Sequence, residues 1–189
     1  DLVREIVTNT DQVTVSALGA NGAAGGCFLA LASDFVVARE GVILNPHYKN
    51  MGNLYGSEYW TYLLPRRVGR ARVAAVMGHR LPMGTDEAQS LELLDATWSA
   101  ESYDAELQAF LHARSADGNA LLKDKRMSRA RDEAEKSLDA YRDEELEHIK
   151  LNFYGFDPSY HVARYHFVHK TPHSRTPPYL ATHRRIPAG

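Results

Sequence analysis

Cysteine is almost absent from this 189-residue chain, and neither sign of charge dominates it. Cys27 is the only cysteine, so the chain can form no intramolecular disulfide, which fits the reducing cytosol. The formal net charge of -2 predicts no general affinity for nucleic acid or for an anionic membrane. No apolar run reaches the roughly 18 residues of a membrane span, and the polar N-terminus lacks the pattern of a signal peptide. We therefore expect a cytoplasmic protein with neither a nucleic-acid nor a membrane partner.

Hydrophobic residues make up 44% of the chain, which is enough for the core of one domain of ordinary size. In the first quarter, β-branched runs alternate with glycines and short apolar segments. These patterns predict the end of a helix at 2–8, strands at 13–19, 34–38 and 42–45, and a short helix at 27–33. A strand, a helix and a strand in quick succession predict an α/β fold with buried strands.

The rest of the chain has mainly helical periodicity. We expect a helix at 57–64 that ends before Pro65, another at 70–78, a third capped by Thr85, and a last strand within 93–98. Residues 102–150 are expected to be mostly helix, and the alternating charges of 123–150 indicate a solvated face. This organisation predicts a core over 1–100, C-terminal helices over 101–150 and an aromatic, histidine-rich tail over 151–189.

Gly25 and Gly26 lie where the first strand gives way to a helix. Backbone N–H groups at such a point have no intrahelical acceptor, and glycine allows a ligand to approach them closely. The two glycines therefore predict either an oxyanion-binding turn or a tight turn without a ligand, and spacing alone does not separate these alternatives.

The order of motifs across residues 13–98 is more specific than any one of them. The run ALGANGAAGG is followed by an Asp-led strand, an Asn-Pro turn and the sequence LPRRVG. This order resembles the crotonase (enoyl-CoA hydratase/isomerase) superfamily. The resemblance implies a ββα superhelix that binds a coenzyme A thioester, with one oxyanion-hole N–H on Gly25 and Gly26 beside it. It also implies that the front of that fold, including the other oxyanion N–H, precedes residue 1.

Two positions depart from the hydratases of that superfamily. The resemblance places Phe28 where they carry one catalytic glutamate, and His47 or Tyr48 where they carry the other. A hydratase mechanism therefore lacks its acid–base pair here.

Residues 43–69 and 152–177 together resemble one group of the superfamily, the HoxX/HypX hydrogenase maturation factors. The resemblance implies an upstream domain in cis that uses formyl-tetrahydrofolate, and partners in the hydrogenase maturation machinery. It further implies that a formyl group is passed to coenzyme A and released as carbon monoxide for the iron of the nickel–iron enzyme.

Decarbonylation of formyl-CoA needs a base for the formyl proton and a proton donor for the sulfur. Glu58, expected in the first turn of a helix between aromatic residues, is the predicted base, and Tyr48 is its predicted partner. The structural alternatives are a helix N-terminal acid for Glu58 and a core aromatic for Tyr48. His47 is a weaker candidate, because a hydrogen-bonded structural histidine explains it better than a catalytic base does.

Several other residues have simpler explanations. Arg66, with Arg67, is a candidate for the coenzyme A phosphates, although a solvated pair also fits. Cys27 is expected to be inert packing inside its apolar helix. The tail histidines match no common zinc pattern, so we predict no metal and expect them to pack over the domain or against the upstream one. These histidines are His161, His166, His169 and His173.

Three functions follow from the resemblance and these residues. The first is a lyase-type enzyme that decarbonylates formyl-CoA. The second is a module that binds coenzyme A without chemistry, which the loss of both hydratase carboxylates favours. The third is an enoyl-CoA hydratase or isomerase with His47 as its base.

Overall fold

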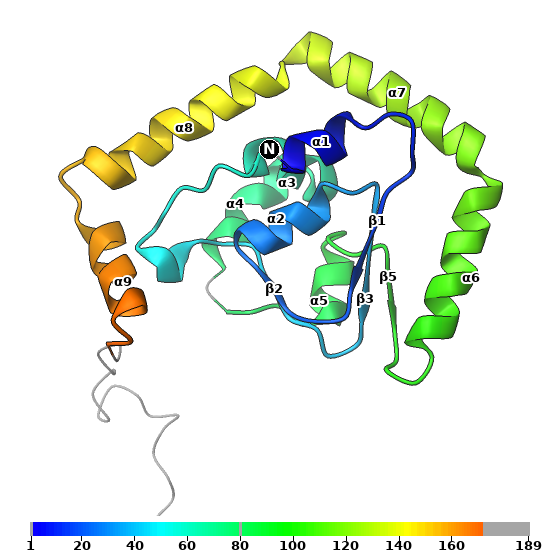
Figure 1. The fold of residues 1–189 in the computed structure, drawn as a ribbon, viewed down its shortest axis with the longest axis horizontal. Helices are drawn as coiled ribbons and strands as arrows, with labels where there is room; N and C mark the ends of the chain where they lie inside the picture. Colours follow the sequence, from blue (N-terminus) through cyan, green and yellow to red (C-terminus); the bar gives the residue numbers. More distant parts are fainter. Residues whose placement is uncertain (1, 80, 172–189) are drawn as a thin grey trace, which may run out of the picture.

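A computed structural model describes residues 2–79 and 81–171 of the chain. Its central sheet has three parallel strands in the order β1 (Val15–Leu18), β3 (Phe35–Arg39) and β5 (Ala96–Trp98), as Figure 1 shows. A second parallel pair joins β2 (Gly22–Ala23) to β4 (Leu44–Asn45). Parallel strands that are joined through helices are the expected result of the sequence pattern, and the predicted α/β architecture is confirmed.

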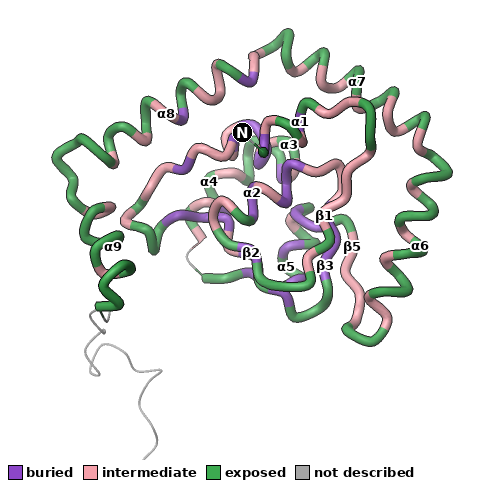
Figure 2. The backbone as a smooth tube through the Cα atoms, viewed as in Figure 1, coloured by how far each residue is buried: buried purple, intermediate pink, exposed green. Residues whose placement is uncertain are grey.

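Short helices surround these strands. The described core contains α1 (Leu2–Thr8), α2 (Gly25–Leu31), α3 (Trp60–Val68), α4 (Val73–Gly78) and α5 (Thr85–Ser90), with 3-10 turns η1 (Lys49–Met51) and η2 (Arg70–Arg72). Helix α2 is the most deeply enclosed, because its residues Cys27 and Phe28 are 0% exposed and pack among strand and α3 side chains. Figure 2 shows that the buried residues gather around α2 and the strands.

Two predicted helix ends were wrong. Helix α3 continues through Pro65 to Val68 instead of ending before the proline. An interior proline costs about 3 kcal/mol, whereas burying a Leu or Val side chain stabilises by about 1.5–3 kcal/mol. Leu64 and Val68 are both fully enclosed, so their burial offsets the cost. At α5, Gly84 takes the N-cap position and Thr85 is the first helical residue, with its side chain buried.

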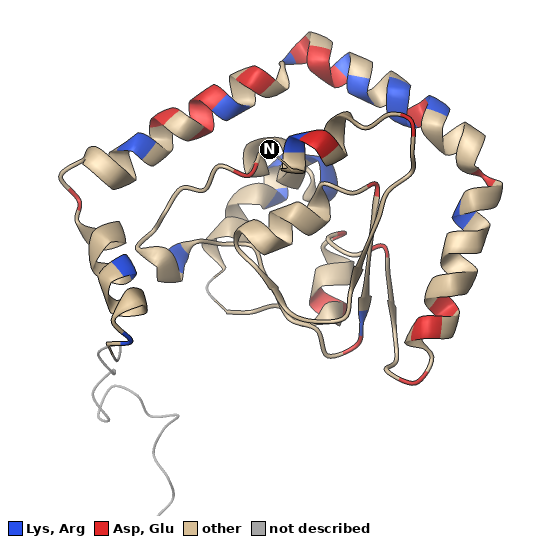
Figure 3. Ribbon diagram, in the orientation of Figure 1, with Lys and Arg blue, Asp and Glu red and all other residues tan. Residues whose placement is uncertain are grey.

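The C-terminal helices form an arc around one side of the core (Figure 1). They are α6 (Tyr103–Ala116), α7 (Gly118–Glu135), α8 (Leu138–Tyr154) and α9 (Ser159–Val168), which confirms that 102–150 is mostly helical. Figure 3 shows charges of both signs mixed along α6, α7 and α8. In the part of the chain that the structure describes, none of the helices has the length and apolar run that a membrane crossing requires.

Candidate active site

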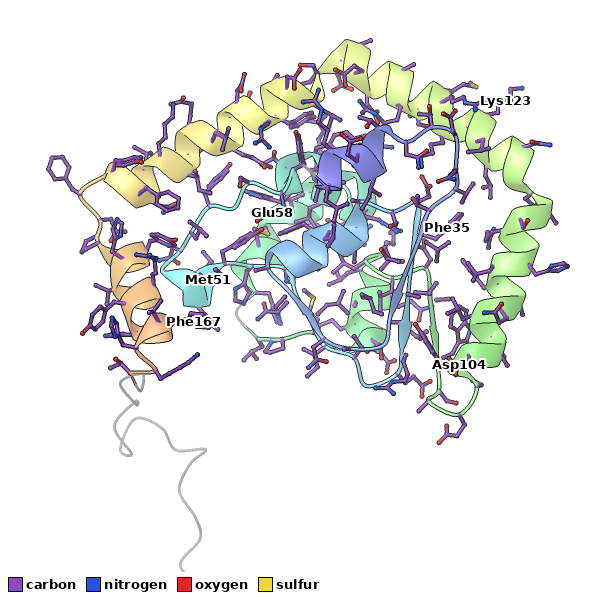
Figure 4. All side chains as sticks on the ribbon, in the orientation of Figure 1. Phe35, Met51, Glu58, Asp104, Lys123 and Phe167 are labelled. Carbon is purple, nitrogen blue, oxygen red and sulfur yellow. The ribbon has the colours of Figure 1, made fainter. Side chains whose placement is uncertain are left out.

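Three predicted site residues from separate segments meet at one point. The hydroxyl of Tyr48 donates a hydrogen bond to Oε2 of Glu58, and the backbone N–H of Ser57 donates to the same oxygen at 2.9 Å. A methyl group added to Gly25 would lie 2.9 Å from Oε1 of Glu58, so the carboxylate rests directly against the glycine. Figure 4 places the labelled Glu58 at the centre of the molecule, beside α2.

Tyr48 is held in one orientation by the residues around its ring. It is 4% exposed, and its ring stacks on Phe28 with centroids 5.9 Å apart. Gly56 has a φ of 86°, and a Cβ there would lie 2.6 Å from the tyrosine ring, so only glycine fits. Burial raises the pKa of Tyr48 well above its usual range, and the hydrogen bond to Glu58 raises it further. The phenol therefore keeps its proton and can act as a donor.

The N-terminus of α2 provides the predicted anion-binding position. Ala24 has a φ of 48° and a ψ of -125°, which only a surrounding structure that enforces it can maintain. Its N–H donates to the carbonyl of Asn45 at 2.8 Å, which holds the turn against β4. Gly25 is the first helical residue, so its N–H has no carbonyl within the helix to receive it. Gly26 follows at the exposed side of the same turn.

Glu58 does not lie in the first turn of a helix, as the sequence predicted. Helix α3 begins two residues later, and Tyr59 between them has left-handed backbone angles of φ 57° and ψ 28°. The carboxylate of Glu145 from α8 meets this helix start. It accepts the backbone N–H groups of Tyr59 and Thr61 at 2.8 and 2.9 Å and the Thr61 hydroxyl at 2.6 Å. The unusual entry to α3 is thus capped by a residue from a distant helix.

Glu145 was missed because its surroundings in the sequence are a charged, solvated face. It is 0% exposed. Burial raises the pKa of its carboxyl group, while the hydrogen bonds from Thr61 and Tyr59 oppose that change and the charge of Glu58 adds to it. The available signal was weak. Leu138, Tyr141 and Glu145 share one helical face, and the first two are apolar or aromatic.

Arg66 lies apart from this group. Its guanidinium pairs with Asp132 of α7 and sits over the ring of Tyr62. It borders a cavity of about 340 Å³, which also meets residues 31–33 at the end of α2 away from Gly25. Arg67 forms two hydrogen bonds to Asp95, both at 2.9 Å. A contact between Arg66 and coenzyme A phosphates stays a prediction.

The remaining candidates contribute to packing. Burial raises the pKa of the Cys27 thiol to about 12, so it stays protonated, as expected of inert packing. His161 Nε2 lies 2.9 Å from the carbonyl of Phe153, and the His169 ring packs on Tyr165. Among residues 2–79 and 81–171, no three His, Cys, Asp or Glu side chains lie close enough to hold a metal ion. His173 lies outside the described residues.

Comparison with known proteins identifies the family. The family described as enoyl-CoA hydratase/isomerase matches residues 1–150, most of the 189-residue chain. The chain belongs to this family. Its closely packed Gly25, Tyr48 and Glu58 are therefore set in a crotonase-type fold, as the order of motifs predicted.

Within the enoyl-CoA hydratase/isomerase family, the resemblance to one group is strong. The chain is 56% identical to the hydrogenase maturation factor HoxX of Bradyrhizobium diazoefficiens over 97% of its own length and 33% of the relative's length. A crystal structure of HypX from Aquifex aeolicus in complex with tetrahydrofolic acid matches 99% of the chain with a TM-score of 0.85 and 46% identity. The chain covers 34% of that structure. It is thus a homologue of the crotonase-like part of HoxX and HypX and spans about a third of their length.

At lower identity, the likeness extends to solved enoyl-CoA hydratases and concerns the fold alone. An enoyl-CoA hydratase from Mycobacterium avium subsp. paratuberculosis matches 93% of this chain, with a TM-score of 0.76 and 23% identity. The chain covers 69% of that structure.

Phe28 and His47, the two residues predicted to stand at hydratase glutamate positions, are both buried. Phe28 is 0% exposed and lies against Tyr48 and Trp60. His47 is 4% exposed, and its Nδ1 accepts the N–H of Lys49 at 3.0 Å, which secures the turn into η1. The geometry supports a structural role for His47.

Proposed function

We propose that this domain binds formyl-CoA and decarbonylates it to carbon monoxide and free coenzyme A, as part of a hydrogenase maturation factor. The observation that carries the proposal is the direct contact of Tyr48 with Glu58 beside Gly25. A carboxylate, a neutral phenol and an outward N–H in one place are the three groups that the reaction needs.

The step is balanced within the substrate and these side chains. The Gly25 N–H holds the formyl oxygen, and Glu58 removes the formyl proton. The electron pair of the C–H bond stays on carbon, the C–S bond breaks, and its pair leaves on sulfur. Carbon monoxide departs while Tyr48 donates a proton to the thiolate. Glu58 returns its proton to Tyr48 along their hydrogen bond in the same step, so no phenolate is left in the buried site and both residues regain their starting states.

Coenzyme A enters this scheme as the substrate's carrier. Gly25 and Gly26 present an uncapped helix start to the thioester, and α2 has no side-chain cap that would compete for it. Arg66 is the candidate to bind a phosphate of coenzyme A. Its guanidinium now pairs with Asp132, and on binding it would contact the phosphate in addition to this carboxylate or in place of it.

The formyl group requires a source outside this domain. Because the chain spans about a third of its relatives, we propose that an upstream formyl-tetrahydrofolate-using domain in the same protein transfers the formyl group to coenzyme A. The folate in the HypX complex supports a one-carbon donor of this kind.

The test is carbon monoxide release by the full-length protein, supplied with formyl-tetrahydrofolate and coenzyme A and followed with a haem protein that changes colour on binding the gas. We expect release from the wild type and a fall of about 10²- to 10⁴-fold in Tyr48→Phe and in Glu58→Gln, the usual size of a general acid–base contribution. Tyr154→Phe and Glu106→Gln, on exposed faces of α8 and α6, are the matched controls and should retain the wild-type rate.

The contrary outcomes have distinct meanings. Undiminished release from both site variants would leave this domain as a binder of coenzyme A without chemistry. No release from the wild type would contradict decarbonylation, and hydration of crotonyl-CoA would then be assayed with His47→Ala.

A further inference from the structure

Glu145 is a fully enclosed carboxylate on a helix whose neighbouring acids face solvent. It is 0% exposed, whereas Glu144 and Glu147 are exposed and form ion pairs with lysines at the surface. A buried carboxylate is costly unless its oxygens are well hydrogen-bonded. Glu145 meets that condition through the three donors of Tyr59 and Thr61 described above.

Those donors adjoin the predicted base. Tyr59 follows Glu58 directly, and its left-handed backbone turns the chain from the site into α3. Left-handed angles are uncommon for an aromatic residue and need support from outside the segment. The carboxylate of Glu145 gives that support, because it binds the N–H of Tyr59 itself and the N–H two residues later.

The same face of α8 continues this support on the other side of Glu58. His148 stacks on the ring of Tyr55 with centroids 4.3 Å apart. Asn152 accepts the Tyr55 N–H at 3.0 Å and donates to the carbonyl of Asn53 at 3.4 Å. Glu145, His148 and Asn152 are spaced three and four residues apart, so they lie in one row along the helix. Helix α8 therefore holds the segment on both sides of the site.

We propose that Glu145 is a positioning residue for the reaction: by fixing the backbone of Tyr59 and Thr61, it aims the carboxylate of Glu58 at Tyr48 and Gly25. This inference rests on the proposed role of Glu58 as the base. Glu145 itself acts through the backbone and does not contact the reacting atoms. A neutral amide at this position would present an NH₂ group to at least one of the three donors, so the present arrangement requires the carboxylate.

The kinetic test compares Glu145→Gln with Glu147→Gln in the full-length protein. Glu147 lies two residues further along α8, where its side chain is 69% exposed. For Glu145→Gln we expect kcat for carbon monoxide release to fall about 10²-fold per folded molecule, since a small misplacement of a reacting group costs that much. KM for formyl-CoA should change less than about twofold, because the substitution removes no contact that the protein makes with the bound substrate. Glu147→Gln should match the wild type in both constants.

Thr61→Val gives a milder second variant. It keeps the backbone N–H groups and removes only the hydroxyl that donates to Glu145 at 2.6 Å. We expect kcat to fall about tenfold, because the carboxylate of Glu145 loses one of its three hydrogen-bond donors. If Glu145→Gln does not fold, a wild-type kcat in Thr61→Val overturns the proposal. A wild-type kcat per folded molecule in Glu145→Gln overturns it equally.

A crystal structure of Glu145→Gln separates this inference from the proposed function. We expect the hydrogen bond between Tyr48 and Glu58 to be broken in the variant and intact in Glu147→Gln. This readout does not depend on which thioester the site takes. If the wild type releases no carbon monoxide, the proposed reaction is wrong, but the positioning role is not yet contradicted. An unchanged hydrogen bond between Tyr48 and Glu58 in the Glu145→Gln crystal structure would contradict the positioning role.

Discussion

At the scale of single residues, the site depends on how closely side chains approach backbone. Glu58 lies against the Cα of Gly25, and the Tyr48 ring lies against that of Gly56. A side chain at either position would collide with one of these two residues, so the neighbouring group is the reason that glycine is needed there. The backbone of Gly25 itself does not require glycine, since its φ is outside the left-handed region.

Gly25→Ala should therefore disable the site without unfolding the protein. The new methyl group would lie 2.9 Å from Oε1 and 3.2 Å from Cδ of Glu58, which forces the carboxylate away from Tyr48. We expect carbon monoxide release to fall about 10²-fold. Stability should fall by no more than about 2 kcal/mol, because the gain from alanine in a helix, about 0.5–1 kcal/mol, partly offsets the loss of the hydrogen bond between Tyr48 and Glu58.

The control for this substitution is Gly78→Ala in α4, where a Cβ meets nothing within 4 Å. Release rates and melting temperatures of the two variants are measured side by side. A wild-type rate in Gly25→Ala would show that the position of the Glu58 carboxylate does not matter.

At the scale of elements, α9 is fastened to the loop that carries Tyr48. Gly52 ends η1 with left-handed angles, and a Cβ on it would lie 2.3 Å from the carbonyl oxygen of Ser159 at the start of α9. In Figure 4, Met51 of η1 and Phe167 of α9 lie on the same side of the molecule. Helix α9, the described part of the aromatic tail, therefore packs against η1, just after the Tyr48 position.

Gly52→Ala should release α9 from η1, because the methyl group collides with backbone that cannot rotate away. We expect faster hydrogen exchange in the amides of α9, measured by mass spectrometry of the full-length protein. Gly41→Ala is the matched control. Gly41 also has a left-handed φ, of 82°, but a Cβ there meets nothing within 4 Å. Equal exchange in both variants would mean that the close contact does not hold α9.

At the scale of the whole molecule, partly buried polar contacts are among those that bind the arc of C-terminal helices to the core. Lys125 of α7 reaches Asp34 at 2.7 Å, with side chains 10% and 23% exposed. Asp34 also accepts the N–H and the hydroxyl of Thr14, at 2.7 and 2.9 Å. Arg129 donates to the hydroxyl of Tyr62 at 2.9 Å. The position of α7, and of α8 after it, depends on such contacts.

Asp34→Asn should loosen α7 from the core. The substitution removes the charge that Lys125 neutralises, and a hydrogen bond to a charged group is worth about 2 kcal/mol. We expect the free energy of opening of α7 to fall by that amount, measured by native-state hydrogen exchange of its amides. In Asp11→Asn, which removes the exposed pair with Arg126, the fall should stay below about 1 kcal/mol. Similar effects of the two substitutions would contradict the importance of the Lys125 contact.

Local patterns were sufficient for much of the fold. The alternating run before Gly19, the glycines before Cys27 and the mixed charges after residue 122 each depend on neighbours within a few positions, so their structures were predictable. The resemblance between motifs supplied Tyr48 and Glu58, and their hydrogen bond agrees with their predicted partnership.

Only the tertiary structure decided how Glu58 is held. Helix α3, which follows Glu58, begins later than predicted. It also runs through Pro65, because the burial of its apolar side chains offsets the tendency of proline to end a helix. The start of α3 is capped by Glu145, which lies 86 positions from Tyr59 in the chain. A contact between such distant residues leaves no periodicity in the chain, and a glutamate among charged neighbours has the same local pattern whether it faces water or the core. The sequence thus determined which chemical groups the candidate site contains, and only the tertiary structure placed Glu145 of α8 at the start of α3, beside Glu58.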